Sequence, residues 1–283
     1  MAKDTSRISI TAHYTGYLWY KNGLSDRSFT TPKGRWAYYG LYAGDKASRS
    51  LFGTDIESIL LQRHLLIDHL AEKILTEHGE VQILELACGL SPRGYRFYQN
   101  SDVTPLRYVE ADLPAMANRK QQLLNDLGDM DSRHKVVPCN IFQEKGDLSL
   151  TSILNKEFTT TKPLLVITEG LVNYFPTPTI EPFWQRLAQQ LQEFSTGIYL
   201  TDIISDDPSN KSTPWLKMGI GILAAVARGK TALHYRGDKD LQSAFLRQGF
   251  TDCKIHNPNE FYDILSIPVS RTDPTIRIVE NTV

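Results

Sequence analysis

Residues 81–91, with the sequence VQILELACGLS, decide the fold class of this 283-residue chain. The apolar run from Val81 to Ala87 is long enough for a buried strand, and Gly89 follows two residues after its end. A short apolar run that ends in a small-residue turn and leads into a helical segment is typical of a strand–turn–helix unit. The stretch therefore predicts the first strand and the first turn of an α/β fold.

Further short apolar runs alternate with helical patterns along the rest of the chain. The expected strands are Leu106–Val109, Lys135–Pro138, Leu164–Thr168, Ile198–Ile203, Thr251–His256 and Thr275–Val279. The expected helices begin at Thr54 (with Gly79 as the stop), Met116, Ile180 and Lys239. Strands and helices that alternate at this spacing indicate a mostly parallel sheet with helices on both faces. We expect one α/β domain over residues 1–283.

Two segments lie outside this alternation and are expected to form a cap. Residues 1–52 contain ten of the 28 aromatic residues, with eight basic residues against three acidic ones. Residues 206–237 are an insertion whose apolar run, Met218–Ala227, is too short to cross a bilayer. The aromatic and basic N-terminal segment suits an aromatic or anionic substrate. Packing of the aromatic residues against the sheet would produce the same pattern.

The composition is that of an ordinary folded protein and excludes several classes of function. The chain has 31 Lys+Arg against 32 Asp+Glu, which argues against a general nucleic-acid binder. The three cysteines are far apart, so no disulfide framework is expected. We expect a reducing, cytoplasmic location. The histidines and cysteines have no metal-site spacing, and the N-terminus has no secretory signal, so neither a metal nor a membrane partner is expected. The sequence does not indicate the oligomeric state.

Arg63 is a charged residue on the apolar face of the helix that begins near Thr54. It lies three residues after Leu60 and four before Ile67, which are both part of the apolar stripe. A guanidinium on the inward face of a helix is rarely left unpaired, because burying an isolated charge is costly. We therefore expect a buried carboxylate beside Arg63.

Acidic residues follow the strands at the edge where parallel α/β sheets bind ligands. Glu110 comes about 20 residues after Gly89, the separation at which an acid binds a ribose diol, and Asp112 is two residues further on. Because the turn at Gly89 lacks the G-x-G-x-x-G pattern, an adenosine cofactor without a pyrophosphate is favoured over a dinucleotide. Glu169 ends the most apolar strand and could hold a cationic group. Each acid could also be no more than a polar residue at the end of a strand.

Three segments resemble the main sequence blocks of the leucine carboxyl methyltransferase family. They are ELACGLSPRGYRF (85–97), YVEADLPAMANRKQQLL (108–124) and VITEGLVNYF (166–175), and they occur in the order and spacing of the family. The resemblance extends from about Arg63 to Tyr174 and continues more loosely to Asp202. It implies a Rossmann-like class I methyltransferase fold and the cofactor S-adenosylmethionine. The family includes enzymes that methylate a protein C-terminal carboxylate and relatives that act on polyketides and other small molecules.

The resemblance also implies roles for individual residues. It assigns Arg63 to the methionine carboxylate of the cofactor, and Asp112 with Glu110 beside it to the ribose. It places Tyr174 in the substrate cleft, as the candidate catalytic residue. The other cofactor-binding positions that it implies are Glu85, Ala87, Gly89, Asn140, Ile141 and Glu169.

The chain departs from the family pattern in two places. Ser91-Pro92 stands before Arg93 where the family often has Asp-Thr. Asn140-Ile141 replaces the acid-apolar pair that holds adenine, and an asparagine carbonyl accepts a hydrogen bond without charge assistance. We therefore expect weaker cofactor binding. Arg93 and Arg96 match family arginines, and an ion pair that braces the helix would explain them equally well.

Together these features predict an S-adenosylmethionine-dependent O-methyltransferase that acts by in-line transfer on a carboxylate or hydroxyl of a small molecule. An ionised carboxylate needs no general base, whereas a phenol would benefit from one, and His234 and Tyr235 of the insertion are candidates. A non-catalytic S-adenosylmethionine-binding or scaffold protein on the same fold is an alternative. A nicotinamide-dependent oxidoreductase shares the fold class, but the missing glycine pattern disfavours it.

Overall fold

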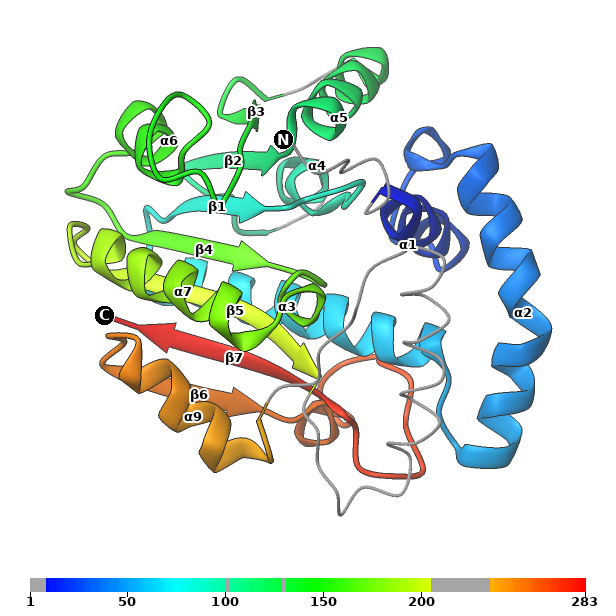
Figure 1. Cartoon of the computed structure of the whole chain (residues 1–283). Coiled ribbons are helices and arrows are strands. Elements are labelled where there is room, and N and C mark those ends of the chain that lie inside the picture. The colour runs from blue at the N-terminus through cyan, green and yellow to red at the C-terminus, as the bar shows by residue number, and fades with distance from the viewer. Residues whose placement is uncertain (1–8, 100–101, 129–130, 205–234) are drawn as a thin grey trace.

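A computed structural model describes residues 9–99, 102–128, 131–204 and 235–283. Within them, seven strands form one sheet in the order β3-β2-β1-β4-β5-β7-β6 (Figure 1). The strands are β1 (Gln82–Leu86), β2 (Arg107–Asp112), β3 (His134–Pro138), β4 (Leu164–Thr168), β5 (Gly197–Ile204), β6 (Asp252–His256) and β7 (Ile276–Thr282). Strands β1 to β5 are parallel, and β7 runs antiparallel to both β5 and β6. The expected mostly parallel α/β sheet is confirmed.

Helices cover both faces of this sheet (Figure 1). One face carries α3 (Ile56–His78), α4 (Arg93–Gln99) and α5 (Pro114–Leu127), and the other carries α6 (Leu150–Glu157), α7 (Thr177–Leu191) and α9 (Asp238–Arg247). Alternating side chains of the strands feed two separate cores, so that Ile83 packs with α3 while Leu84 packs with α7. None of the described helices is long and apolar enough to cross a lipid bilayer.

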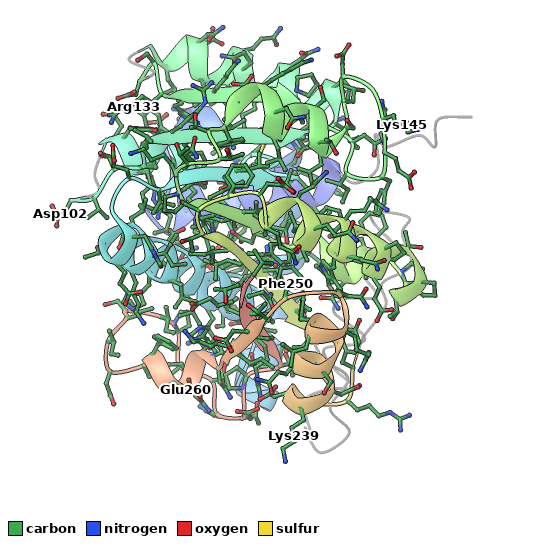
Figure 2. The ribbon with its side chains drawn as sticks, turned by 90° about the vertical axis from the view of Figure 1, so that its left-hand side faces the viewer. Asp102, Arg133, Lys145, Lys239, Phe250 and Glu260 are labelled. Atoms are coloured by element: carbon green, nitrogen blue, oxygen red, sulfur yellow. The ribbon has the colours of Figure 1, made fainter. Side chains whose placement is uncertain are left out.

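A side view with the side chains drawn compares a residue of the interior with charged residues of the surface (Figure 2). Phe250, next to β6, is buried within the molecule. The charged residues labelled in that view lie at its surface: Asp102, Arg133, Lys145, Lys239 and Glu260.

Helix α3 is the element that positions Arg63. Asp55 caps its N-terminus, with the carboxylate accepting a hydrogen bond from the Ser58 amide at 2.6 Å. Gly79 ends it in a left-handed conformation with φ of 75°, as the sequence predicts. Because most of α3 is buried, its inward face brings Arg63 to the carboxyl ends of the parallel strands.

The order of the strands reverses between β1 and β4. The chain leaves β1 toward α4 on one face of the sheet and leaves β4 toward α7 on the other face. Loops that diverge in this way open a crevice outside the carboxyl ends of the strands, which is where ligands bind in such sheets. The candidate site is therefore at the ends of β1, β2 and β4.

The N-terminal helices α1 (Ser9–Lys21) and α2 (Pro32–Phe52) lie beyond the same carboxyl ends (Figure 1). Helix α1 rests on the turn after β1, because a Cβ placed on Gly89 would lie 3.1 Å from the Cβ of Ala12. Several aromatic residues of this segment pack against α3, in a buried cluster that comprises Tyr14, Tyr17, Leu18, Trp19, Tyr38, Leu60 and Leu61. Packing thus accounts for these aromatic residues. The expected cap insertion at 206–237 lies almost wholly outside the described residues.

Candidate functional site

The turn after β1 is joined to the end of β2 by Asp112. Its carboxylate accepts hydrogen bonds from the amides of Gly89, at 2.8 Å, and Leu113, at 2.7 Å. Gly89 has φ of 52° and Ala87 has φ of 53°, so the turn uses a left-handed conformation twice. Burial raises the pKa of Asp112 above its ordinary value, although both amides oppose that shift. Asp112 is only partly buried and is the last residue of β2.

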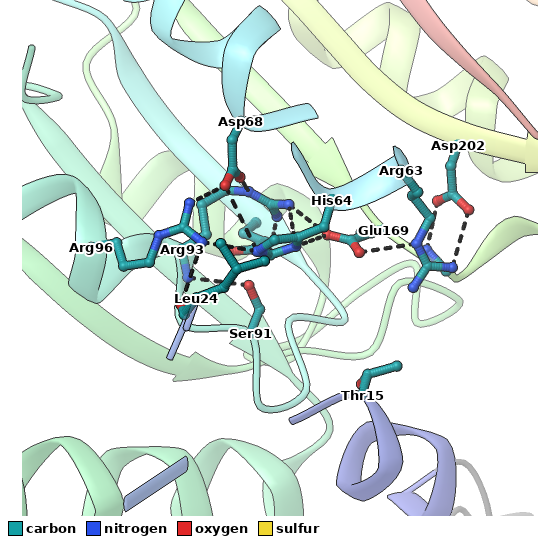
Figure 3. A network of polar contacts seen from close by, with 12 residues as sticks. Thr15, Leu24, Arg63, His64, Asp68, Ser91, Arg93, Arg96, Glu169 and Asp202 are labelled. Atoms are coloured by element: carbon teal, nitrogen blue, oxygen red, sulfur yellow. Dashed lines mark hydrogen bonds and ion pairs between the residues drawn. The ribbon is translucent and has the colours of Figure 1, made fainter. Parts of the chain in front are cut away.

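Arg63 has the buried carboxylate partners that the sequence predicts. Its Nε donates to Glu169 Oε1 at 2.9 Å, and its Nη1 donates to Asp202 Oδ2 at 3.4 Å (Figure 3). Burial alone would lower the pKa of this guanidinium, but the carboxylates of Asp202 and Glu169 raise it. Among the described residues, none accepts a hydrogen bond from Nη2. Arg63 is 9% exposed, so its guanidinium is almost completely enclosed by the protein.

Glu169 is the hub of the site, because it contacts three basic groups of the protein. Besides Arg63, it accepts a hydrogen bond from Arg93 Nη2 at 2.5 Å and lies 2.9 Å from His64 Nδ1 (Figure 3). Burial would raise the pKa of this carboxyl, but His64, Arg93 and Arg63 hold it well below its ordinary value. The cationic groups that Glu169 was expected to attract are thus supplied by the chain itself.

Arg93 braces helix α4 against the sheet, as the structural interpretation of the sequence predicts. It is fully buried, and its Nε and Nη1 donate to Asp68 and Glu85 at 2.5 and 2.6 Å. The other oxygen of Glu85 accepts a hydrogen bond from the Tyr108 hydroxyl at 2.7 Å. Glu85 is 1% exposed and both of its carboxylate oxygens accept hydrogen bonds within the protein, so its position does not support the expectation that it binds the cofactor.

Glu110 is also buried inside the protein rather than exposed at the crevice. It has no exposed surface and forms ion pairs with Lys120, at 2.8 Å, and His134, at 3.4 Å. Helix α4 comes close enough to cover it because residue 94 is glycine. A Cβ there would lie 2.8 Å from Glu110 Oε1 and 2.6 Å from His134 Nε2. This placement does not support the expectation that Glu110 binds the ribose beside Asp112.

Asn140 and Ile141 follow β3, and both are half-buried. The side-chain oxygen of Asn140 accepts a hydrogen bond from the Phe142 amide at 3.1 Å, which fixes its orientation. Ile141 packs against the core beneath α7. That Asn140 and Ile141 lie on the adenine side of a cofactor site stays a prediction.

Tyr174 closes a short 3₁₀ turn after β4 and is half-buried. It is close enough to Arg63 to contribute to the raised pKa of the guanidinium. The neighbouring Asn173 fixes this turn to the end of β5, because its amide exchanges two hydrogen bonds of 3.0 Å with the backbone of Ile204. Tyr174 therefore comes from a well-anchored segment on the β4 side of the crevice.

The two candidate bases of the insertion receive no support. The hydroxyl of Tyr235 donates to Glu181 of α7 at 3.0 Å, and its ring lies against Trp184. His234 lies outside the described residues.

Three residues of the site were not predicted from the sequence. His64, Asp68 and Asp202 complete the network around Arg63 and Arg93. His64 and Asp68 are four residues apart, so they share a face of α3, and this spacing is a signal that was available. Asp202 ends a predicted strand beside that of Glu169, and its position there was a second available signal.

The sequence and the fold match known proteins. The family model described as leucine carboxyl methyltransferase matches residues 26–188. A DUF574 family protein from Streptomyces avermitilis has a TM-score of 0.60 at 12% identity, with 96% of each chain covered. A protein from Thermobifida fusca, described as a methyltransferase, has a TM-score of 0.57 at 14% identity, with 95% of this chain and 93% of that chain covered.

A third structure, from Nostoc punctiforme and described as an O-methyltransferase, has a TM-score of 0.50 at 13% identity. The alignment covers 78% of this chain but only 57% of the Nostoc protein. No curated protein matches the sequence significantly. At such low identities these structures establish the fold and leave the family to be decided by the sequence match.

Proposed function

The chain belongs to the leucine carboxyl methyltransferase family, and we propose that it transfers the methyl group of S-adenosylmethionine to a carboxylate or hydroxyl oxygen of a small molecule. The observation that carries the proposal is that the Gly89–Asp112 contact and the Arg63–Glu169 pair lie at the carboxyl ends of three neighbouring strands, β1, β2 and β4, where the strand order reverses. That crevice is where a fold of this class binds its ligand.

The residues at this crevice fit the parts of the cofactor. Asp112 stands at the end of β2, where an acid can accept hydrogen bonds from both hydroxyls of a ribose. Nη2 of Arg63, which no residue in the described part of the chain engages, can form a charge-assisted hydrogen bond to the methionine carboxylate. The amide of Gly89 is held by Asp112, which keeps the turn beside the position proposed for the ribose, and Asn140 and Ile141 follow β3 on the side proposed for adenine.

When bound, S-adenosylmethionine supplies an activated methyl group on a sulfonium. The task of the protein is then to orient the acceptor oxygen in line and to exclude water. We assign Tyr174 to the first task, because its turn is anchored to β5 beside Arg63. An ionised carboxylate acceptor would need no general base, which is consistent with the engagement of the Tyr235 hydroxyl by Glu181. The basic N-terminal segment favours an anionic or aromatic acceptor.

Calorimetric titration with S-adenosylmethionine and S-adenosylhomocysteine tests the proposal, with NADH as the control. We expect micromolar binding of the first two and no binding of NADH. Asp112→Ala should weaken both by about 10- to 100-fold, because hydrogen bonds to a charged group contribute about 1.5–3 kcal/mol. Failure of the wild-type protein to bind either compound would contradict the proposal.

A measurement of methyl transfer distinguishes a methyltransferase from a non-catalytic protein that only binds S-adenosylmethionine. After cofactor binding is established, mass spectrometry of mixtures with small carboxylic acids and phenols should detect a methylated product. A protein that binds S-adenosylmethionine and methylates nothing in either class would favour the non-catalytic interpretation. Tyr174→Phe should lower turnover more than it lowers cofactor affinity.

A further inference from the structure

Arg93 connects the elements that surround the crevice. Its three nitrogens each donate to a different carboxylate: Asp68 of α3, Glu85 of β1 and Glu169 at the end of β4. The guanidinium has no exposed surface, so the arrangement is fixed by the fork of three donors rather than by solvent. A lysine at this position would keep the charge but could not reach all three carboxylates in the same geometry.

Glu169 transmits this constraint to Arg63. Its Oε2 is held by Arg93 and its Oε1 by Arg63, at 2.5 and 2.9 Å. A carboxylate is planar and rigid, so rotating one oxygen away from Arg93 moves the other oxygen relative to Arg63. On its far side the guanidinium of Arg63 lies against Gly170, where a Cβ would be 3.0 Å from Nη1. Arg63 is thus confined between Glu169 and Gly170.

We propose that Arg93 is a positioning residue for cofactor binding, which acts through Glu169 to aim Nη2 of Arg63, for which the described residues provide no acceptor, at the carboxylate of the methionine part. This inference rests on the proposed function, because it assumes the cofactor contact of Arg63. A purely structural brace would affect the stability of the fold and would weaken all ligands of the crevice alike. A positioning residue weakens only ligands that carry the amino-acid part.

Two ligands distinguish these roles. S-adenosylhomocysteine carries the amino acid, whereas 5′-methylthioadenosine has the same adenine and ribose without it. We expect Arg93→Lys to weaken S-adenosylhomocysteine by about tenfold, the loss of about 1.4 kcal/mol, and to leave the affinity for 5′-methylthioadenosine within about twofold. Arg96→Lys is the matched control, because Arg96 also contacts Asp68 and His64 but does not contact Glu169. It should change neither affinity by more than about twofold.

A double-mutant cycle tests the route through Arg63. Arg63→Ala should weaken S-adenosylhomocysteine selectively, and Arg93→Lys added to it should cause no further loss. If thermal unfolding shows that Arg93→Lys does not fold, Glu169→Asp takes its place in the cycle. This variant keeps the charge but is one methylene too short to contact both arginines.

The outcomes are separable. Selective loss without additivity supports the inference. Equal weakening of both ligands, or a further loss in the Arg63→Ala background, overturns it while leaving the proposed function intact. A wild-type protein that binds neither ligand overturns the proposed function and this inference together.

Discussion

Two carboxylates of β2, two residues apart, have different surroundings. Asp112 ends the strand and accepts amide hydrogen bonds at the crevice, whereas Glu110 lies one pleat further in and is covered by α4 and α5. The ion pairs with Lys120 and His134 lower the pKa of Glu110 against the effect of burial. Its role is therefore to neutralise a buried lysine.

Glu110→Gln tests this difference at the level of one residue. The variant leaves the buried ammonium of Lys120 without its charged partner, which should lower the free energy of unfolding by about 3–5 kcal/mol. The affinity of the folded protein for S-adenosylhomocysteine should stay within about twofold of wild type. Urea unfolding and calorimetry measure the two quantities. A loss of affinity as large as that of Asp112→Ala would restore Glu110 to the cofactor site.

At the scale of elements, the junction between α2 and α3 collects negative charge. Asp45 of α2 accepts hydrogen bonds from the amides of Ile56 and Glu57, at 2.7 and 3.1 Å, and Asp55 caps the same helix. Burial raises the pKa of Asp45 to about 6, and the charges of Asp55 and Glu57 add to this shift although both amides oppose it. Three carboxyl groups, those of Asp45, Asp55 and Glu57, thus surround the N-terminus of α3.

This raised pKa predicts a pH dependence of stability. The protonated form of Asp45 is favoured by folding, so its contribution is present below pH 3.8, the ordinary value, and is lost as the pH rises through about 6. We expect Asp45→Asn to remove this component. The free energy of unfolding of the variant should therefore fall less between pH 4.5 and pH 7 than that of the wild type. Urea titrations of both proteins at the two pH values measure it. An identical difference in the variant would contradict the assignment.

At the scale of the whole molecule, the net charge is close to zero, yet many charged side chains are buried and pair with one another in the interior. Asp68 and Glu169 both lie within it, and each contacts Arg93. Burial would raise the pKa of Asp68, but His64 and the two arginines Arg96 and Arg93 lower it to about 2. The pKa of Glu169 is held well below its ordinary value in the same way.

Lowered carboxyl pKa values predict sensitivity to acid. The stabilisation is present above the ordinary values of 3.8 and 4.5 for Asp68 and Glu169, and it is lost as the pH falls through the lower values of the folded state. Glu169→Gln should therefore show a smaller fall in the urea midpoint between pH 5 and pH 3 than wild type. Glu77→Gln, which alters an exposed ion pair with Lys73, serves as the control and should keep the wild-type fall. Equal falls in all three proteins would exclude a dominant role for Glu169.

Local patterns of the sequence determined most of the sheet. The strand Leu164–Thr168 has the predicted bounds, and Gly79 ends α3 as expected. These features depend on side chains that are neighbours along the chain, so periodicity and turn residues suffice to predict them. The family blocks likewise lie in consecutive residues. The N-terminal helices were not predicted as helices, because the aromatic residues of that segment obscure a single apolar face.

The tertiary structure alone decided which charges meet. The sequence required a buried carboxylate for Arg63, but the choice of Glu169 and Asp202 depends on the pairing of β4 with β5 and on the docking of α3. In the same way, the burial of Glu110 depends on the approach of α4 at Gly94. Arg63 is 106 and 139 positions away from these two partners along the chain, so local spacing does not determine the pairing. Composition and spacing identify a charge that needs a partner, and only the packed fold determines which partner lies within hydrogen-bonding distance.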